Sequence, residues 1–213
     1  MRGVVLAGGG ATRYGGRPKG LERVGGVRIL DRVVDAMTEA FGATPLLVAN
    51  APDASTWRDD LDVVADVRPG LGALGGLHTA VRLGPAPVVV AAWDMPFVTT
   101  GLLTALAAGL ADADACLPES GGRRGVEPLC AAYGPACLAA IERALDEGDL
   151  RAIGFHRHIR VGILPLDEVR RFGDPATLFL NVNTPDELAQ AEAAWQARGS
   201  SPSSAARTPE RPR

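Results

Sequence analysis

The sequence lacks the features that mark several large classes of protein. Its three cysteines, Cys116, Cys130 and Cys137, form no Cys-x-x-Cys pair, so neither a disulfide framework nor a zinc site is predicted. The formal net charge is −3, and without a basic excess we expect no nucleic-acid partner. No apolar run approaches the roughly 20 residues of a membrane-spanning helix, and no signal peptide is recognisable. We therefore expect a cytoplasmic protein with no membrane partner.

Aromatic residues make up only 5% of the 213 residues, so the core must consist mainly of aliphatic side chains. Runs that suit buried parallel strands occur at 4–6, 46–49, 63–65 and 88–92, with helical apolar spacing between them. The predicted fold class is α/β: a single-domain, three-layer sandwich at 1–198, with a mostly parallel, Rossmann-like sheet and helices on both faces. Residues 199–213 lack an apolar period and are predicted to form a disordered tail.

The second half of the chain has a less regular pattern. After Asp94, Thr99 or Thr100 can cap a helix that reaches Leu110, and a capping box predicts another helix from Pro185 to about Ala197. In that box Thr184 is the N-cap and Glu187 lies three residues later. Further elements are expected as strands at 115–117 and 129–133 and as a helix at 135–147.

A glycine-rich loop with two basic residues, Arg13 and Lys19, follows the first predicted strand. Glycines allow backbone N–H groups to surround an anion, so the loop is a candidate phosphate site. A Walker A loop is excluded because Lys19 is followed by Gly20 rather than Ser or Thr. The dinucleotide fingerprint fails because Arg13 stands at its third glycine position.

Two other predicted strands are followed by carboxylates. Asp94 comes two residues after the apolar run at 88–92. There it can bind Mg²⁺ or, alternatively, cap the helix that starts near Pro96. Asp66 precedes a glycine-rich turn and can accept hydrogen bonds from a sugar or a base, and Asn50 is a weaker nucleotide contact. Ligands of parallel sheets gather at the carboxyl ends of the strands, so these residues are expected in one site.

Polar residues elsewhere give weaker signals. Asn181 and Asn183 are two residues apart, so on an extended segment both side chains face one site; alternatively they only shape the turn before the helix. His156 and His158 are expected to be solvated surface residues, and His78 to be structural.

The segment from Leu6 to Lys19 is Leu-Ala-Gly-Gly-x-x-x-Arg-x-Gly-x-x-x-Lys, which resembles the signature loop of nucleotidyltransferases. With the 66–76 turn, the Asp94-Met95-Pro96 tip and the 181–188 segment, most of the chain looks like a molybdenum cofactor guanylyltransferase. The resemblance implies a glycosyltransferase-A-like fold. The chain departs from the family pattern at Ala73, Trp93 and Glu127.

The resemblance also implies roles for the candidate residues. Asp94 would hold Mg²⁺, and Arg13, Lys19 and Asp94 would be catalytic. The acceptor would contact Asn181 and Asn183. The nucleotide would contact the first loop, the second turn and both strand tips, namely Leu6, Ala7, Gly8, Gly9, Lys19, Asn50, Asp66 and Asp94.

The implied reaction transfers GMP from GTP to the phosphate of molybdopterin, in its molybdenum-bound form, and releases pyrophosphate. GTP and Mo-molybdopterin are thus the expected substrates, Mg²⁺ the cofactor, and cofactor-delivery proteins are possible partners. A cytidylyltransferase or sugar-phosphate nucleotidyltransferase is an alternative, although these more often have Leu-Ala-Ala-Gly in the first loop. A second alternative is a non-catalytic, nucleotide-binding regulatory module, which the presence of both Lys19 and Asp94 disfavours.

Overall fold

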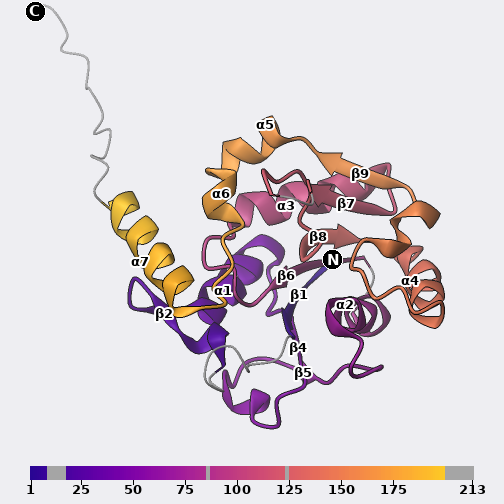
Figure 1. Ribbon diagram of the computed structural model, residues 1–213, viewed down its shortest axis with the longest axis horizontal. Helices are drawn as coiled ribbons and strands as arrows, with labels where there is room; N and C mark the ends of the chain where they lie inside the picture. The colour runs from indigo at the N-terminus through magenta and orange to yellow at the C-terminus, as the bar shows by residue number, and fades with distance from the viewer. Residues whose placement is uncertain (9–17, 85–86, 123–124, 200–213) are drawn as a thin grey trace, which may run out of the picture.

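The computed structural model describes residues 1–8, 18–84, 87–122 and 125–199, and it contains a seven-stranded sheet (Figure 1). The strand order is β5-β4-β1-β6-β8-β7-β9. The strands of this sheet are β1 (Arg2–Ala7), β4 (Leu46–Ala49), β5 (Val63–Val64), β6 (Val88–Ala92), β7 (Ala115–Pro118), β8 (Cys130–Tyr133) and β9 (Val161–Leu164).

The sheet is mostly parallel, as the sequence predicts. Strand β1 pairs in parallel with β4 and β6, and the Val4 position of β1 lies opposite Leu46 on one side and Val90 on the other. Strand β8 runs antiparallel to both of its neighbours, β6 and β7, while β9 is parallel to β7. The carboxyl ends of β1, β4, β5 and β6 therefore meet at one edge of the sheet.

Helices cover both faces of the sheet, which gives the three layers. The side chains of Val4 and Val5 point to opposite faces, and each is fully buried in a different apolar cluster. Helices α1 (Ile29–Phe41) and α3 (Thr100–Ala108) pack on the Val5 face, and α2 (Gly72–Leu83) and α4 (Cys137–Asp146) pack on the Val4 face. Burial on both faces explains why β1 and β6 are continuous apolar runs rather than alternating ones.

A third apolar cluster joins the end of the chain to the hairpin of β2 (Arg23–Val24) and β3 (Val27–Arg28). Helix α7 (Pro185–Gly199) lies beside β2 (Figure 1). Ala191 of α7 is buried with Val24, and Val182, just before the helix, is also buried in this cluster. This packing brings the 181–183 segment next to the carboxyl end of β6.

The expected elements are present, with small differences at their ends. Strand β5 stops at Val64, β8 begins at Cys130, and α3 ends at Ala108 before a 3₁₀ turn (Gly109–Ala111). The sequence did not predict β9, the β2–β3 hairpin or the short helices α5 (Leu166–Val169) and α6 (Pro175–Leu178). The predicted tail begins at residue 199, and 200–213 lie outside the described residues.

Candidate active site

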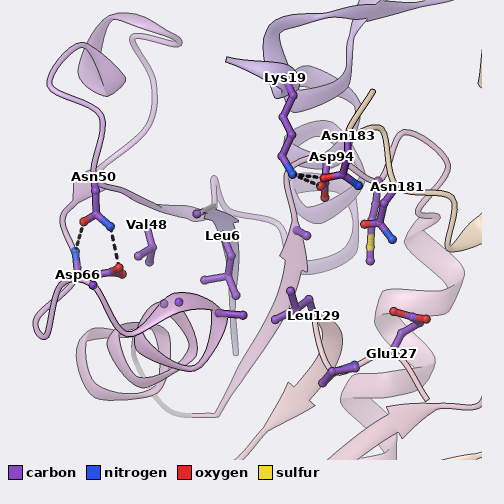
Figure 2. A pocket seen from close by; sticks show the side chains of 18 residues that line it. Leu6, Lys19, Val48, Asn50, Asp66, Asp94, Glu127, Leu129, Asn181 and Asn183 are labelled. Carbon is purple, nitrogen blue, oxygen red and sulfur yellow. Dashed lines mark hydrogen bonds and ion pairs between the residues drawn. The ribbon is translucent and has the colours of Figure 1, made fainter. Parts of the chain in front are cut away.

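A pocket of about 520 Å³ opens at the carboxyl ends of β1, β4, β5 and β6 (Figure 2). The lining residues come from strand tips, from the start of α2, from the segment before β8 and from the segment before α7. They are Leu6, Gly8, Lys19, Val48, Asn50, Asp66, Gly70, Gly72, Ala73, Gly76, Ala92, Asp94, Met95, Glu127, Pro128, Leu129, Asn181 and Asn183.

Asp94 lies at the tip of β6 and is only 5% exposed. Hydrogen bonds of the backbone fix its position. The Val182 N–H donates to the Asp94 carbonyl oxygen at 2.9 Å, and the N–H of the preceding residue, Trp93, donates to the Leu6 carbonyl oxygen at 3.1 Å. Helix α3 begins later, and its cap is Thr99, whose hydroxyl accepts from the Leu102 N–H. The alternative prediction that Asp94 caps this helix is therefore wrong.

Lys19 holds two oxygens on segments that are far apart in the sequence. Its Nζ donates to Asp94 Oδ2 and to Asn183 Oδ1, each at 2.5 Å. The other carboxylate oxygen of Asp94, Oδ1, is buried and has no hydrogen-bond partner among the described residues. Lys19 is also the one basic side chain among the described residues that line the pocket.

Asn50 and Asp66 form a pair across the pocket from Lys19 (Figure 2). The Asn50 Nδ2 donates to Asp66 Oδ2 at 2.7 Å, and the Asp66 backbone N–H donates to Asn50 Oδ1 at 2.8 Å. These two hydrogen bonds fix the carboxylate of Asp66 at the end of β5. Leu6 and Val48 form an apolar surface between this pair and Lys19.

Glycines bring backbone close to the Asn50–Asp66 pair. Gly70 and Gly72 have φ angles of +80° and +62°, so the turn into α2 depends on their conformational freedom. A Cβ at Gly76 would lie 3.8 Å from both Asp66 Oδ1 and Leu6 Cδ2. The backbone of α2 thus passes close to the Asp66 carboxylate at Gly76.

The two asparagines before α7 both line the pocket but have different partners. Asn183 binds Lys19, whereas the Asn181 Nδ2 donates to the Phe179 carbonyl oxygen at 3.1 Å. The predicted cap by Thr184 is confirmed, because the Glu187 N–H donates to Thr184 Oγ1 at 3.2 Å. The reciprocal bond of a capping box is shifted by one residue, because Glu187 Oε2 accepts from the backbone N–H of Asn183, at 2.7 Å, instead of that of Thr184. The side chain of Asn183 is therefore not needed to cap the helix.

The other predicted loop residues are placed as follows. Leu6 and Gly8 line the pocket, whereas the side chain of Ala7 is buried among apolar residues that pack against α1 and α3. Gly9 and Arg13 lie outside the described residues.

The sequence did not identify Glu127, Pro128 and Leu129 as site residues, yet all three line the pocket. The only signal was that Glu127 departs from the family pattern. Trp93, which also departs from the family pattern, does not line the pocket, because its ring stacks on that of Trp57 with the ring centroids 4.9 Å apart. The Trp93 ring also packs directly against Gly20, where a Cβ would overlap the ring.

The cysteines offer no nucleophile. All three are buried, and burial raises the pKa of the Cys137 thiol to about 12 and that of Cys130 further. His78 is buried in α2, with Nε2 3.3 Å from Glu142 Oε1, as expected for a structural residue. His156 differs from the prediction, because it is half-buried and burial lowers its pKa to about 4.

Within the described part of the chain, no group of three or more His, Cys, Asp or Glu side chains is placed to hold a metal ion. A metal at Asp94 would need most of its ligands from water or a bound substrate, which is the usual arrangement for Mg²⁺ in phosphate-transfer sites. None of the helices in the described residues is both long enough and apolar enough to cross a bilayer.

Comparison with known proteins identifies the family of this chain. Residues 3–161 match the model of the MobA-like NTP transferase domain. The chain is 32% identical to the molybdenum cofactor guanylyltransferase of Desulfosudis oleivorans over 92% of this chain and 96% of that protein, and 34% identical to that of Mesorhizobium japonicum over 90% and 94%. The crystal structure of molybdopterin-guanine dinucleotide biosynthesis protein A from Archaeoglobus fulgidus is 28% identical, with a TM-score of 0.78 over 92% of this chain and 100% of that one. This chain belongs to the MobA-like NTP transferase family.

Proposed function

We propose that this nucleotidyltransferase transfers GMP from GTP to the phosphate of Mo-molybdopterin, forming the guanine dinucleotide cofactor and pyrophosphate. The relatives that share its family and nearly its full length carry the name molybdenum cofactor guanylyltransferase. The observation that carries the proposal is one pocket holding both the Lys19–Asp94–Asn183 cluster and the Asn50–Asp66 pair. The first suits phosphates and the second a nucleoside.

The reaction needs no nucleophile from the protein. An oxygen of the acceptor phosphate forms a bond to the α-phosphorus of GTP, while the bond from this phosphorus to the bridging oxygen of pyrophosphate breaks. Pyrophosphate leaves with the electron pair, and the attacking and leaving oxygens are roughly in line. The contribution of the protein is to position the two substrates and to neutralise their charge.

Lys19 is placed to bind the phosphates. An ammonium group has three N–H donors, and Asp94 and Asn183 accept two of them. The third donor is available for a phosphate oxygen, and its direction is fixed by the other two. Lys19 would thereby offset the negative charge that develops on pyrophosphate in the transition state. Arg13 is proposed to share this task.

Asp94 is the residue proposed to hold Mg²⁺. Its Oδ1 is buried without a partner among the described residues, and an unsatisfied buried carboxylate oxygen is costly unless a cation binds it. Oxygen ligands and a single protein carboxylate fit Mg²⁺, which is often bound together with substrate phosphates. When bound, Mg²⁺ would supply positive charge beside the α-phosphate.

The Asn50–Asp66 end of the pocket is proposed to bind the guanosine. Guanine presents N1–H and N2–H₂ donors on one edge, which neither adenine nor cytosine presents, and these donors fit a carboxylate or backbone carbonyl groups. Asp66 is half-buried, and a hydrogen bond to a charged group contributes about 1.5–3 kcal/mol, so a preference for GTP of about tenfold or more is expected. Asn181 and Asn183 are proposed to contact the acceptor.

Pyrophosphate release from each of the four nucleoside triphosphates, with and without Mo-molybdopterin, tests the proposal. We expect release from GTP only when the acceptor and Mg²⁺ are present. Release from CTP instead would indicate a cytidylyltransferase, and release with a sugar phosphate as acceptor would indicate a sugar-phosphate nucleotidyltransferase. GTP binding without release under any condition would indicate a regulatory module.

A further inference from the structure

Two of the three tryptophans of the chain have no role in the proposed function, yet Trp93 directly precedes Asp94 and stacks on Trp57. Both rings are buried, and the angle between their planes is 17°. Neither Nε1 has a hydrogen-bond partner among the described residues. A buried tryptophan usually finds such a partner, so in the described part of the chain these rings are held by packing alone.

The ring of Trp93 packs directly on the backbone of Gly20. A Cβ at Gly20 would overlap the ring, and Gly20 is itself buried. The φ angle of Gly20 is not positive, so its backbone conformation does not require glycine. Glycine is required here because the ring approaches the backbone so closely.

This contact lies next to the Lys19–Asp94 ion pair on both chain segments (Figure 2). Lys19 precedes Gly20 in the sequence, and Asp94 follows Trp93. The backbone of Trp93 is bonded to β1, because its N–H donates to the Leu6 carbonyl oxygen. The contact between the ring and Gly20 therefore sets the separation of the two segments that carry the ammonium and the carboxylate.

The segment that carries Lys19 is a single 3₁₀ turn (Lys19–Leu21). Its backbone bonds run from Leu21 N to Pro18 O (3.0 Å) and from Glu22 N to Lys19 O (3.1 Å). Hydrogen bonds in a 3₁₀ turn have poorer geometry than those of an α-helix, so so short a turn depends on what it packs against. A lysine whose backbone is held in place loses less entropy when its ammonium binds a ligand.

Trp57 holds the ring of Trp93 from a different part of the chain. The N–H of Trp57 donates to the Ala54 carbonyl oxygen at 3.2 Å, and its own carbonyl oxygen accepts from Arg28 Nη1 at 2.8 Å. Arg28 also binds the carboxylate of Asp31, in α1, with two hydrogen bonds of 2.7 and 2.8 Å. The stack is thus tied to the start of α1, which restricts movement of the Trp93 ring away from Gly20.

We propose that Trp93 is a positioning residue, whose ring supports the Gly20 backbone so that the Lys19 ammonium is directed at a phosphate of GTP. The inference rests on the proposed function, in which Lys19 binds the phosphates. Trp93 does not line the pocket, so it would not touch the nucleotide. Its effect on GTP binding should therefore depend on Lys19.

Calorimetric titration with GTP and Mg²⁺, below the melting temperature of every variant, tests the inference. Trp93→Leu keeps an apolar side chain but removes the ring, so GTP binding should weaken about fivefold or more, and Trp93→Phe should recover part of this loss. In a Lys19→Ala background the same Trp93→Leu change should cause little further loss, because two residues that act through one contact are not additive. A merely structural role would lower the melting temperature without this dependence on Lys19.

Gly20→Ala perturbs the same contact from the other side and leaves no cavity. The added methyl group must move the turn away from the ring, so GTP binding should weaken about fivefold or more, again only when Lys19 is present. The matched control is Phe155→Leu, a buried aromatic residue in the apolar cluster on the opposite face of the sheet. It should lower the melting temperature and leave the affinity for GTP unchanged.

Unchanged GTP affinity in Trp93→Leu and in Gly20→Ala would overturn the inference. An equal loss of affinity with and without Lys19 would overturn it as well, since Trp93 would then act by another route. If Trp93→Leu does not fold, the result for Gly20→Ala decides. A failure of the proposed function looks different, because the unmodified protein itself would then not bind GTP, and the inference would fall with it.

Discussion

At the scale of single residues, the site depends on one cation held between two oxygens. Lys19 binds Asp94 from the tip of β6 and Asn183 from the segment before α7. The charges of Lys19 and Asp94 balance in the absence of substrate. In the proposed complex the third donor of Lys19 binds phosphate, which adds negative charge, and Mg²⁺ at Asp94 would offset that charge.

Replacing Asp94 tests the proposed metal site. Asp94→Asn keeps the shape of the side chain but removes the charge that would hold Mg²⁺, so kcat should fall by about a hundredfold or more. Initial rates over a Mg²⁺ titration measure this. The matched control is Asp62→Asn, an exposed carboxylate paired with Arg2, which should keep full activity. A Mg²⁺ dependence of Asp94→Asn equal to that of the unmodified protein would contradict the assignment.

Replacing Lys19 tests the phosphate contact. Lys19→Ala should weaken GTP binding about tenfold or more, because a charge-assisted hydrogen bond to phosphate is lost. Lys19→Arg should recover only part of it, since a planar guanidinium cannot direct its donors as the ammonium does. Calorimetric titration with GTP gives both values. The control is Arg23→Ala, because the Arg23 side chain is exposed and donates to the Gly26 carbonyl oxygen. A GTP affinity of Lys19→Ala equal to that of the unmodified protein would refute the proposed role of Lys19.

His156 makes a prediction about stability and pH. Burial lowers its pKa from 6.5 to about 4, and its Nε2 has no partner among the described residues. The unfolded chain therefore binds a proton at higher pH than the folded one, so the free energy of unfolding should decrease as pH falls from 6.5 to about 4. The loss should be on the order of 1–2 kcal/mol, because solvent screens the exposed part of the ring.

Urea unfolding at several pH values measures this loss. His156→Phe should show a flatter dependence between pH 6.5 and 4, whereas His158→Phe, at an exposed position, should behave like the unmodified protein. The same slope in His156→Phe and in the unmodified protein would show that other groups cause the loss.

At the scale of elements, α7 connects stability to the site. Its N-terminal cap joins Thr184 and Glu187, and Glu187 also accepts from the backbone N–H of Asn183. The residue that binds Lys19 thus immediately precedes the helix cap. A substitution that weakens the cap should therefore displace Asn183 and weaken its hydrogen bond with Lys19.

Thr184→Ala should lower the free energy of unfolding by about 1 kcal/mol and should also weaken GTP binding. Thr99→Ala removes the corresponding cap of α3, which lies away from the pocket, and should reduce stability with no change in GTP affinity. Urea unfolding and calorimetry on both variants give the comparison. Equal GTP affinity in the two would show that the cap and the site are independent.

Some of these elements and contacts were predictable from the sequence, and others were not. Strand β6 and the Asp94 that follows it were predictable, because an apolar run followed closely by a carboxylate is unusual. Strand β9 was not, because it contains Gly162 and is only partly buried. The contact of Lys19 with Asn183 spans 164 residues and has no local signal. Glu127 follows a turn as a single carboxylate, so only the fold shows that it lines the pocket.

At the scale of the whole molecule, the two proposed binding regions lie at one edge of the sheet. Buried strands supply rigid ends, and the loops after β1, β4, β5 and β6 supply the polar groups. Strand β8 runs in the opposite direction, so the segment before it, Glu127–Leu129, reaches the same edge. We therefore propose that the nucleoside binds on the β4–β5 side of this edge and the acceptor on the β6–β8 side.

A single competition reaction, analysed by mass spectrometry, tests whether this chain makes the guanine dinucleotide cofactor. The protein is incubated with Mg²⁺, Mo-molybdopterin and equal concentrations of GTP and CTP, and the dinucleotide product is identified by its mass. We expect the guanine dinucleotide in at least about tenfold excess over the cytosine form. A product that is mainly the cytosine dinucleotide, or no dinucleotide at all, would contradict it.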